Sequence, residues 1–134
     1  MKHARRGSAL IEFAGSLILL FSVFVGIFQI GYTFFAYNTL VNAVRAGARY
    51  ASLQQTNAEL PKTVKNLVVY GDLAPAASAQ PVVPGLTIDQ VNVTLGPATA
   101  TVSVTGFKLD SLFSQVKLDG RPSITFPLTG GAAR

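Results

Sequence analysis

Apolar side chains dominate one long stretch near the start of the chain. The 32 residues from Phe13 to Val44 include no Asp, Glu, Lys, Arg or His, and Glu12 and Arg45 are the charged residues on either side. About 20 apolar residues are enough for a helix to span a bilayer. The pattern therefore predicts one membrane-competent helix, with a carboxylate, Glu12, directly before the apolar run. An unpaired carboxylate in hydrocarbon is costly, so Glu12 needs an explanation.

The predicted helix is longer than a membrane requires. No proline occurs from Ser8 to Gln54, and a helix of that length measures about 70 Å, more than twice the hydrocarbon thickness. Its second half must therefore leave the membrane. Polar residues enter there among alanines, in pairs four residues apart that share helix faces: Asn38, Asn42, Arg45 and Arg49.

Small residues recur along this helix. Ser22 and Gly26 have the small-xxx-small spacing that lets membrane helices approach one another closely. The alternative is that glycine is simply commoner in membrane helices. The residues predicted to serve helix packing are Gly15, Ser22, Gly26, Gly31, Ala43 and Gly47.

A second helix is predicted in the segment LPKTVKNLVVYG. Asn57 is a possible N-cap, Pro61 falls in the first turn and Gly71 follows the end. Four apolar residues at helical spacing could lie on the first helix: Leu60, Val64, Leu67 and Val68. The following segment, APAASAQPVVPG, is expected to be an irregular connector.

The last third of the chain changes period from helical to alternating. The segments TIDQVNVTL, ATATVSVTGF and GRPSITFPL predict three antiparallel strands, with the first at Ile88 to Leu95. Their apolar face needs a cover, and the two helices are available to provide it. Between the strands, a helical turn or hydrophobic loop is expected from four apolar residues: Leu109, Leu112, Phe113 and Val116. The fold class is α+β.

Composition and charge narrow the function. Three of the basic residues behind the net charge of +5 lie in the first six positions, and the rest are scattered, so a nucleic-acid partner is not expected. The chain has no cysteine and one histidine, His3, which leaves no ordinary catalytic triad or thiolate metal site. Neither a cofactor nor a metal is expected. An enzyme hypothesis rests on turn-flanking aspartates, for which a solvated turn is the commoner role: Asp72, Asp89, Asp110 and Asp119.

The first seven residues, MKHARRG, form a short basic leader. The apolar run behind it is too long for a secretory signal peptide. The positive-inside tendency then predicts that the N-terminus stays in the cytoplasm and the C-terminal part lies across the membrane. The predicted organisation is a leader over 1–7, a long hydrophobic helix over 8–54 and a small α+β globule over 55–134.

This order of leader, Gly7, Glu12 and long helix resembles a type IV pilin-like precursor. More narrowly, RRGSALIEFAGSLILLF and AVRAGARYAS are similar to the TadE-like pseudopilins of the Tad (tight adherence, Flp) pilus system. The resemblance implies cleavage between Gly7 and Ser8 by a prepilin peptidase. It also implies an assembly role for Glu12 and the adjoining Phe13, with Glu12 as the fifth mature residue, paired with the new amine of a neighbouring subunit.

Two positions depart from the family pattern. Ile18 stands where TadE-like chains often have proline, and Ser8 stands where many type IV pilins have the phenylalanine that is N-methylated. The resemblance therefore leaves N-methylation of Ser8 open, together with the choice between a major and a minor subunit.

The resulting function hypothesis is a structural pilus subunit. It would be inserted in the bacterial inner membrane and then assembled into an extracellular or periplasmic filament. The implied partners are copies of this chain or related pilins, the prepilin peptidase and the pilus assembly platform. The alternative is a single-pass anchored periplasmic binding or assembly-accessory protein that does not polymerise, with Glu12 at the level of the lipid headgroups.

Overall fold

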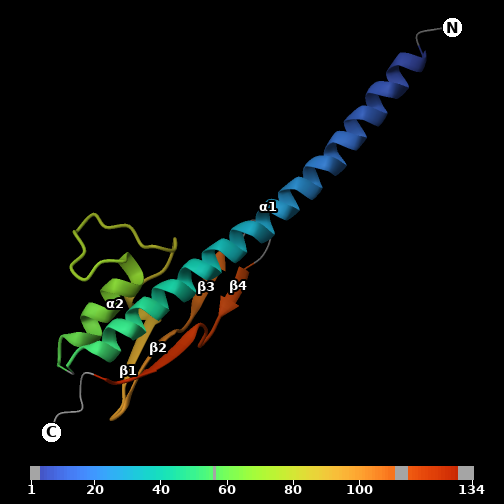
Figure 1. The fold of residues 1–134 in the computed structure, drawn as a ribbon. Helices are drawn as coiled ribbons and strands as arrows, with labels where there is room; N and C mark the ends of the chain where they lie inside the picture. The colour runs from blue at the N-terminus through green and yellow to red at the C-terminus, as the bar shows by residue number, and fades with distance from the viewer. Residues whose placement is uncertain (1–3, 56, 111–114, 130–134) are drawn as a thin grey trace. The chain divides into compact units, whose positions relative to one another are not determined.

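The chain divides into two compact units, residues 1–34 and 35–134, which are described separately. The structure is a computed structural model, and it describes residues 4–55, 57–110 and 115–129 (Figure 1). Within these described ranges the elements are two α-helices, one short 3₁₀ helix and five strands. The α+β class is as expected.

Helix α1 spans Ala4–Leu53, so it begins four residues before the expected start at Ser8 and ends one residue before Gln54. Hydroxyl side chains along it donate hydrogen bonds to the carbonyl four residues earlier. Ser16 Oγ donates to Glu12 O at 2.8 Å, and Ser22 Oγ donates to Ile18 O at 2.8 Å. Each hydroxyl therefore has an acceptor within the helix, as a polar side chain in lipid requires.

Helix α2 spans Leu60–Tyr70, with Pro61 in its first turn and Gly71 after its end as predicted, but its N-cap is Glu59 and not Asn57. The side chain of Asn57 accepts hydrogen bonds from the backbone N–H of Glu59 (3.1 Å) and of Leu60 (2.7 Å), although Glu59 occupies the cap position itself. These bonds satisfy donors that have no partner within the helix. At the other end Gly71 has a φ of 72°, and its N–H donates to Leu67 O at 2.9 Å.

The three-stranded antiparallel sheet is also confirmed, with strand order β1-β2-β5. Its strands are β1 (Val91–Leu95), β2 (Thr99–Val104) and β5 (Ser123–Pro127). The first strand is shorter than expected, because Ile88 belongs to the 3₁₀ helix η1 (Ile88–Gln90). After β5, Thr129 donates through its N–H (3.0 Å) and its hydroxyl (3.2 Å) to Ser52 O, a carbonyl at the free end of α1.

The segment after β2 was predicted wrongly. Instead of a helical turn or loop, the chain forms a two-stranded hairpin of β3 (Phe107–Asp110) and β4 (Gln115–Leu118). The helical spacing of the apolar positions 109, 112, 113 and 116 does not reflect a helix here. The pairing of Phe107 with Leu118 and of Leu109 with Val116 instead gathers apolar side chains with a period of two. Leu112 and Phe113 lie outside the described residues.

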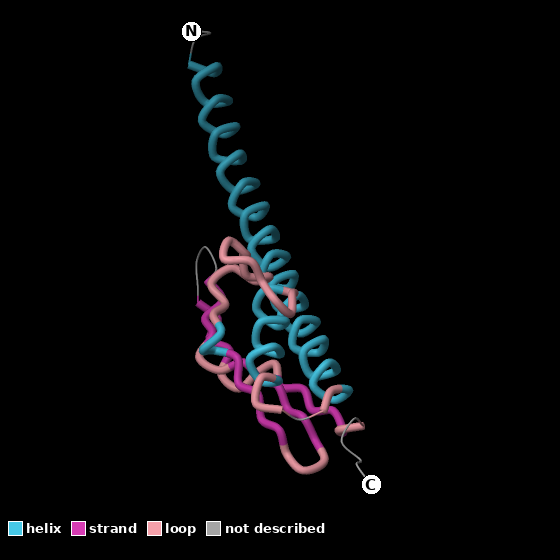
Figure 2. The backbone as a smooth tube through the Cα atoms, turned by 90° about the vertical axis from the view of Figure 1, so that its left-hand side faces the viewer, coloured by secondary structure: helices cyan, strands magenta, loops and turns pink. Residues whose placement is uncertain are grey.

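The core of the second unit lies between the sheet and the helices (Figure 2). The α1 residues that enter it recur every three or four positions: Ala36, Leu40, Val44, Ala48 and Ala51. The α2 residues are Leu60, Val64, Val68 and Val69, so Val69 is buried where Leu67 was expected, and Leu67 is only half-buried. The connector before β1 is irregular, as predicted, and contributes Val83 and Leu86. The two helices therefore cover the sheet as the sequence indicated.

Candidate functional site: the exposed apolar segment of α1

The first unit presents large apolar side chains from Leu10 to Phe34. Among its residues from Leu10 to Ile30, the large exposed apolar side chains range from 54% exposed at Leu17 to 76% exposed at Ile11. Of the helices that the structure describes, α1 alone is long and apolar enough to cross a membrane. A contiguous apolar surface of this size marks a site of interaction with lipid or protein. The segment is thus long and apolar enough to cross a membrane, as its sequence predicted.

Glu12 is exposed within this segment and is held by a neighbouring hydroxyl. Ser8 Oγ donates a hydrogen bond to Glu12 Oε1 at 3.2 Å, across one helical turn. A carboxylate has about four acceptor sites, so one neutral donor leaves most of them available. Among the described side chains, none forms an ion pair with Glu12. Within the described part of the chain, the Ser8 hydroxyl is the donor that the structure gives this carboxylate.

The bond between Gly7 and Ser8 lies within the described part of α1, Ala4–Leu53. A glycine in a helix costs about 0.5–1 kcal/mol relative to alanine, so Gly7 weakens the helix beside this bond. Phe13, which follows Glu12, is 66% exposed and belongs to the apolar surface.

The predicted helix-packing residues fall into two groups. A Cβ atom added at Gly15, Gly26 or Gly31 would meet nothing within 4 Å, so these glycines leave room that the described chain does not use. At Gly47 an added Cβ would overlap with Cγ2 of Val68, because α2 crosses α1 there. Ala43 is also packed against the core of the second unit. Gly47 and Ala43 therefore serve packing within one chain.

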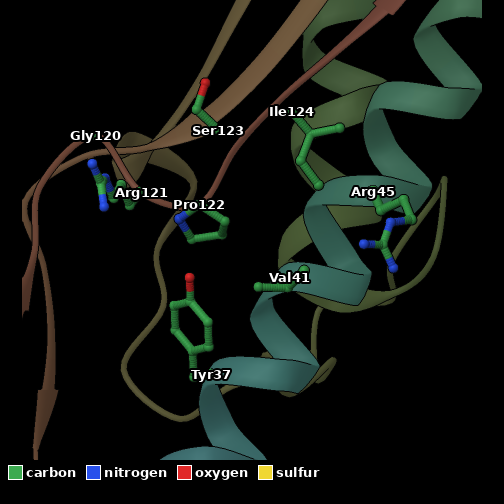
Figure 3. A pocket seen from close by; sticks show the side chains of 8 residues that line it. All are labelled: Tyr37, Val41, Arg45, Gly120, Arg121, Pro122, Ser123 and Ile124. Atoms are coloured by element: carbon green, nitrogen blue, oxygen red, sulfur yellow. The ribbon is translucent and has the colours of Figure 1, made fainter.

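Two surface hollows of the second unit were not predicted from the sequence. One, of about 400 Å³, lies between Tyr37 and Val41 of α1 and the segment 120–124 (Figure 3). The Tyr37 ring points toward Pro122, while Arg45 and Arg121 lie on opposite sides of the hollow. No sequence signal links Tyr37 to Arg121, because the two positions are 84 residues apart and meet only through the fold.

The second hollow, of about 450 Å³, is mainly apolar and lies between α1 and α2. Its lining residues are Asn42, Arg45, Ala46, Arg49, Tyr50, Leu53 and Leu67. Asn42 Oδ1 accepts a hydrogen bond of 3.4 Å from Arg45. The arginines that the sequence placed on one helix face do line a common surface.

The aspartates behind the enzyme hypothesis lie in exposed turns. Asp72 Oδ1 accepts a hydrogen bond from the N–H of Ala74 at 3.2 Å, which is a local turn interaction. Asp89 and Asp119 are exposed, and the side chain of Asp110 lies outside the described part of the chain. Within that part, no group of three or more His, Asp or Glu side chains is arranged to hold a metal ion.

Comparison with known families supports the N-terminal resemblance. Residues 7–49 match the model of a family described as TadE-like protein. The match includes Gly7, Ser8, Glu12 and Phe13 and ends within the part of α1 that belongs to the second unit. No curated protein and no solved structure matches the chain. The TadE-like family is structural and pilus-associated, and the N-terminal third of this chain is similar to it.

Proposed function

We propose that this chain is a structural subunit, a pilin or pseudopilin, of a bacterial Tad-type pilus. It is inserted in the inner membrane with its N-terminus in the cytoplasm, cleaved after Gly7 by a prepilin peptidase, and assembled through its N-terminal helix. The observation that carries this proposal is the exposed apolar surface of α1 from Leu10 onward, inside the segment that matches the TadE-like family.

The energetics of that surface require a second environment. Removing a large apolar side chain from water contributes about 1.5–3 kcal/mol, and the first unit presents more than ten such side chains. A bilayer satisfies them before assembly, and a bundle of neighbouring helices satisfies them afterwards. The three glycines with open space beside them, Gly15, Gly26 and Gly31, allow close approach in such a bundle.

Glu12 gives the assembled state its register. Cleavage after Gly7 creates an amine at Ser8, and that cation on an adjoining copy can pair with Glu12 where water is excluded. Removing one partner from such a buried pair typically costs about 3–5 kcal/mol. A subunit is therefore favoured in the position that brings the two charges together.

The N-terminus of the protein recovered from cells tests the processing step. Mass spectrometry of the membrane and pilus fractions should find a chain that begins at Ser8. Gly7→Leu should block this processing, whereas Gly15→Leu, the matched change two turns further along α1, should leave it intact. A wild-type chain that keeps Met1 in both fractions contradicts the proposal.

Replacement of Glu12 tests the assembly step. Glu12→Ala should leave membrane insertion unchanged and reduce the yield of sheared filaments at least tenfold, because the unpaired amine becomes costly. Ser16→Ala, which removes a neighbouring hydroxyl, is the control and should assemble normally. If Glu12→Ala assembles like the wild type, charge pairing does not drive assembly.

An anchored binding protein is the second candidate, and the hollow beside Arg45 and Arg49 favours it. There a partner would contact apolar and cationic groups of the second unit. Co-expression with a prepilin peptidase separates the two candidates. A gel-mobility shift that Gly7→Leu abolishes supports the pilus subunit, and an unchanged mobility supports the anchored protein.

A further inference from the structure

Strand β1 lies at one edge of the three-stranded sheet in the second unit. In an antiparallel ladder, alternate residues of a strand face the neighbouring strand. Gln90 O accepts a hydrogen bond from Thr105 N–H at 2.8 Å, so the even-numbered residues of β1 face β2. The backbone groups of Val93 and the N–H of Leu95 therefore point to the free edge, where no described residue provides them with a hydrogen-bond partner.

The opposite edge of the sheet, β5, is protected in a way that β1 is not. Val104 N–H donates to Pro122 O at 3.2 Å, so the odd-numbered residues of β5 face outward, and one of them is Pro127. Proline has no N–H to donate, and edge strands commonly use prolines or charged side chains to avoid pairing with another chain. The strand β1, VNVTL, contains neither a proline nor a charge. Its edge is therefore the more open of the two to another strand.

The sequence of β1 matches itself when it is reversed about Val93. Its apolar residues lie on the core side of the sheet, whereas Asn92 and Thr94 are exposed on the outer side. In an antiparallel pair centred on Val93, Asn92 of one copy lies opposite Thr94 of the other, and Val91 lies opposite Leu95. Apolar side chains then meet apolar ones, and an amide meets a hydroxyl, each of which can donate and accept a hydrogen bond.

The absence of charge on this side of the sheet favours a second copy over a foreign strand. Like charges directly opposite one another destabilise a strand pair, and two identical strands always bring like charges. The outer face of β1 and β2 carries only amide and hydroxyl side chains: Asn92, Thr94, Thr99, Thr101 and Ser103. An identical strand therefore meets no repulsion there, and a charged foreign strand finds no opposite charge.

We propose that β1 pairs antiparallel with β1 of a second copy, centred on Val93, so that two three-stranded sheets become one continuous sheet. Val93 exchanges both of its backbone hydrogen bonds with Val93 of the copy, and Leu95 N–H donates to Val91 O in both directions. The pairing joins second units to each other, beyond the contact of N-terminal helices proposed above. It does not require cleavage after Gly7.

Amide hydrogen exchange of the unaltered full chain tests the pairing. The chain is held in detergent micelles, and the number of copies per micelle is raised by lowering the ratio of detergent to protein. The amides of Val93 and Leu95 should exchange about tenfold more slowly in micelles with several copies, because their N–H groups gain acceptors. The amide of Thr125, which points outward from β5, should show no such dependence.

A matched pair of added charges separates edge pairing from a change in net charge. Thr94→Lys places a cation on the proposed edge contact and should abolish the slowing at Val93. Thr99→Lys adds the same charge at an exposed position of the central strand and should leave the slowing unchanged. Both substitutions lie on the outer face, away from the core.

Disulfide formation tests the register, because the chain has no cysteine. Asn92→Cys and Thr94→Cys chains, mixed in micelles under mild oxidation, should form mixed dimers about tenfold faster than either variant forms dimers alone. The two positions lie opposite each other at about 4.5 Å between Cα atoms, whereas identical positions are diagonal neighbours about 7–8 Å apart. Thr125→Cys, the control on the β5 edge, should not form dimers.

Three results overturn the strand pairing. Mixed and identical dimers that form at equal rates, or dimers of Thr125→Cys that form as fast, assign the association to other parts of the chain. Exchange at Val93 that is fast at every copy number means that no second strand binds. Exchange that is slow even with one copy per micelle means that the edge is already covered within the chain.

Discussion

The two halves of α1 belong to one helix but differ in what surrounds them. Up to Phe34 the large apolar side chains are mostly exposed, whereas from Ala36 to Ala51 a stripe of smaller apolar residues is almost fully buried. The glycines show the same contrast: Gly26 has open space beside it, and Gly47 is in contact with Val68. One half thus has its packing partners within the chain, and the other half must find them outside it.

This difference means that a single residue type can have two roles in one helix. A substitution in the second half should change the stability of the fold, and the same substitution in the first half should change only insertion or assembly. Urea unfolding of the second unit in detergent micelles measures the first property, with tyrosine fluorescence as the signal because the chain contains no tryptophan.

The largest difference in the free energy of unfolding is expected between two truncations of apolar side chains, one in each half of α1. Leu40→Ala should lower the free energy of unfolding by about 2–5 kcal/mol, because Leu40 is fully buried and its removal leaves a cavity. Phe24→Ala removes a larger side chain that is 65% exposed, and it should change that free energy by less than about 0.5 kcal/mol. Equal losses for both variants would mean that the first half also packs within the chain.

Paired glycine substitutions should give an intermediate effect. Gly47→Ala pushes a methyl group into Val68, a stiff and buried side chain, and overpacking of this kind costs about 1–3 kcal/mol. The gain in helix propensity of about 1 kcal/mol offsets part of that cost. Gly26→Ala lies in the first unit and should leave the unfolding of the second unit unchanged. Urea midpoints should therefore fall for Gly47→Ala and stay level for Gly26→Ala, and the reverse order would contradict the assigned helix contact.

The smallest loss in the free energy of unfolding is expected from substitutions of Asn57, just before α2. Asn57→Ala removes the acceptor for the N–H groups of Glu59 and Leu60 and should cost about 1 kcal/mol. Asn57→Asp keeps an acceptor oxygen and should retain most of the stability. If the two variants unfold at the same urea concentration, the side-chain oxygen of residue 57 does not stabilise the helix.

The local signals of the sequence predicted most of the fold. Gly71 marked the C-terminal end of α2, whereas Asn57, the predicted N-cap, lies two residues before the actual cap, Glu59. Alternation marked the three strands of the main sheet. The hairpin β3–β4 was missed, since the spacing of Leu109 and Val116 with the residues between them imitates a helix. Only pairing across the hairpin reveals the period of two, and pairing partners are not visible in a local pattern.

The roles of the candidate site residues remain predictions. Gly7, Ser8, Glu12 and Phe13 lie within a few residues of one another, so their order along the chain was enough to suggest those roles. The sequence separated the surroundings of Gly26, inside the uncharged run, from those of Gly47, between Arg45 and Arg49. It did not predict that Gly47 packs against Val68 of α2 while Gly26 has open space beside it. Their packing role with other subunits remains a prediction.

The sequence alone determined the apolar helix, its charged boundaries and the period of most later elements, because each depends on residues close together in the chain. Tertiary structure alone decided which face of α1 is buried, why Gly47 must lack a side chain, and that Tyr37 lies near Arg121. Those properties depend on contacts between distant segments, and such contacts form only when the core of the second unit excludes water from the surfaces it brings together.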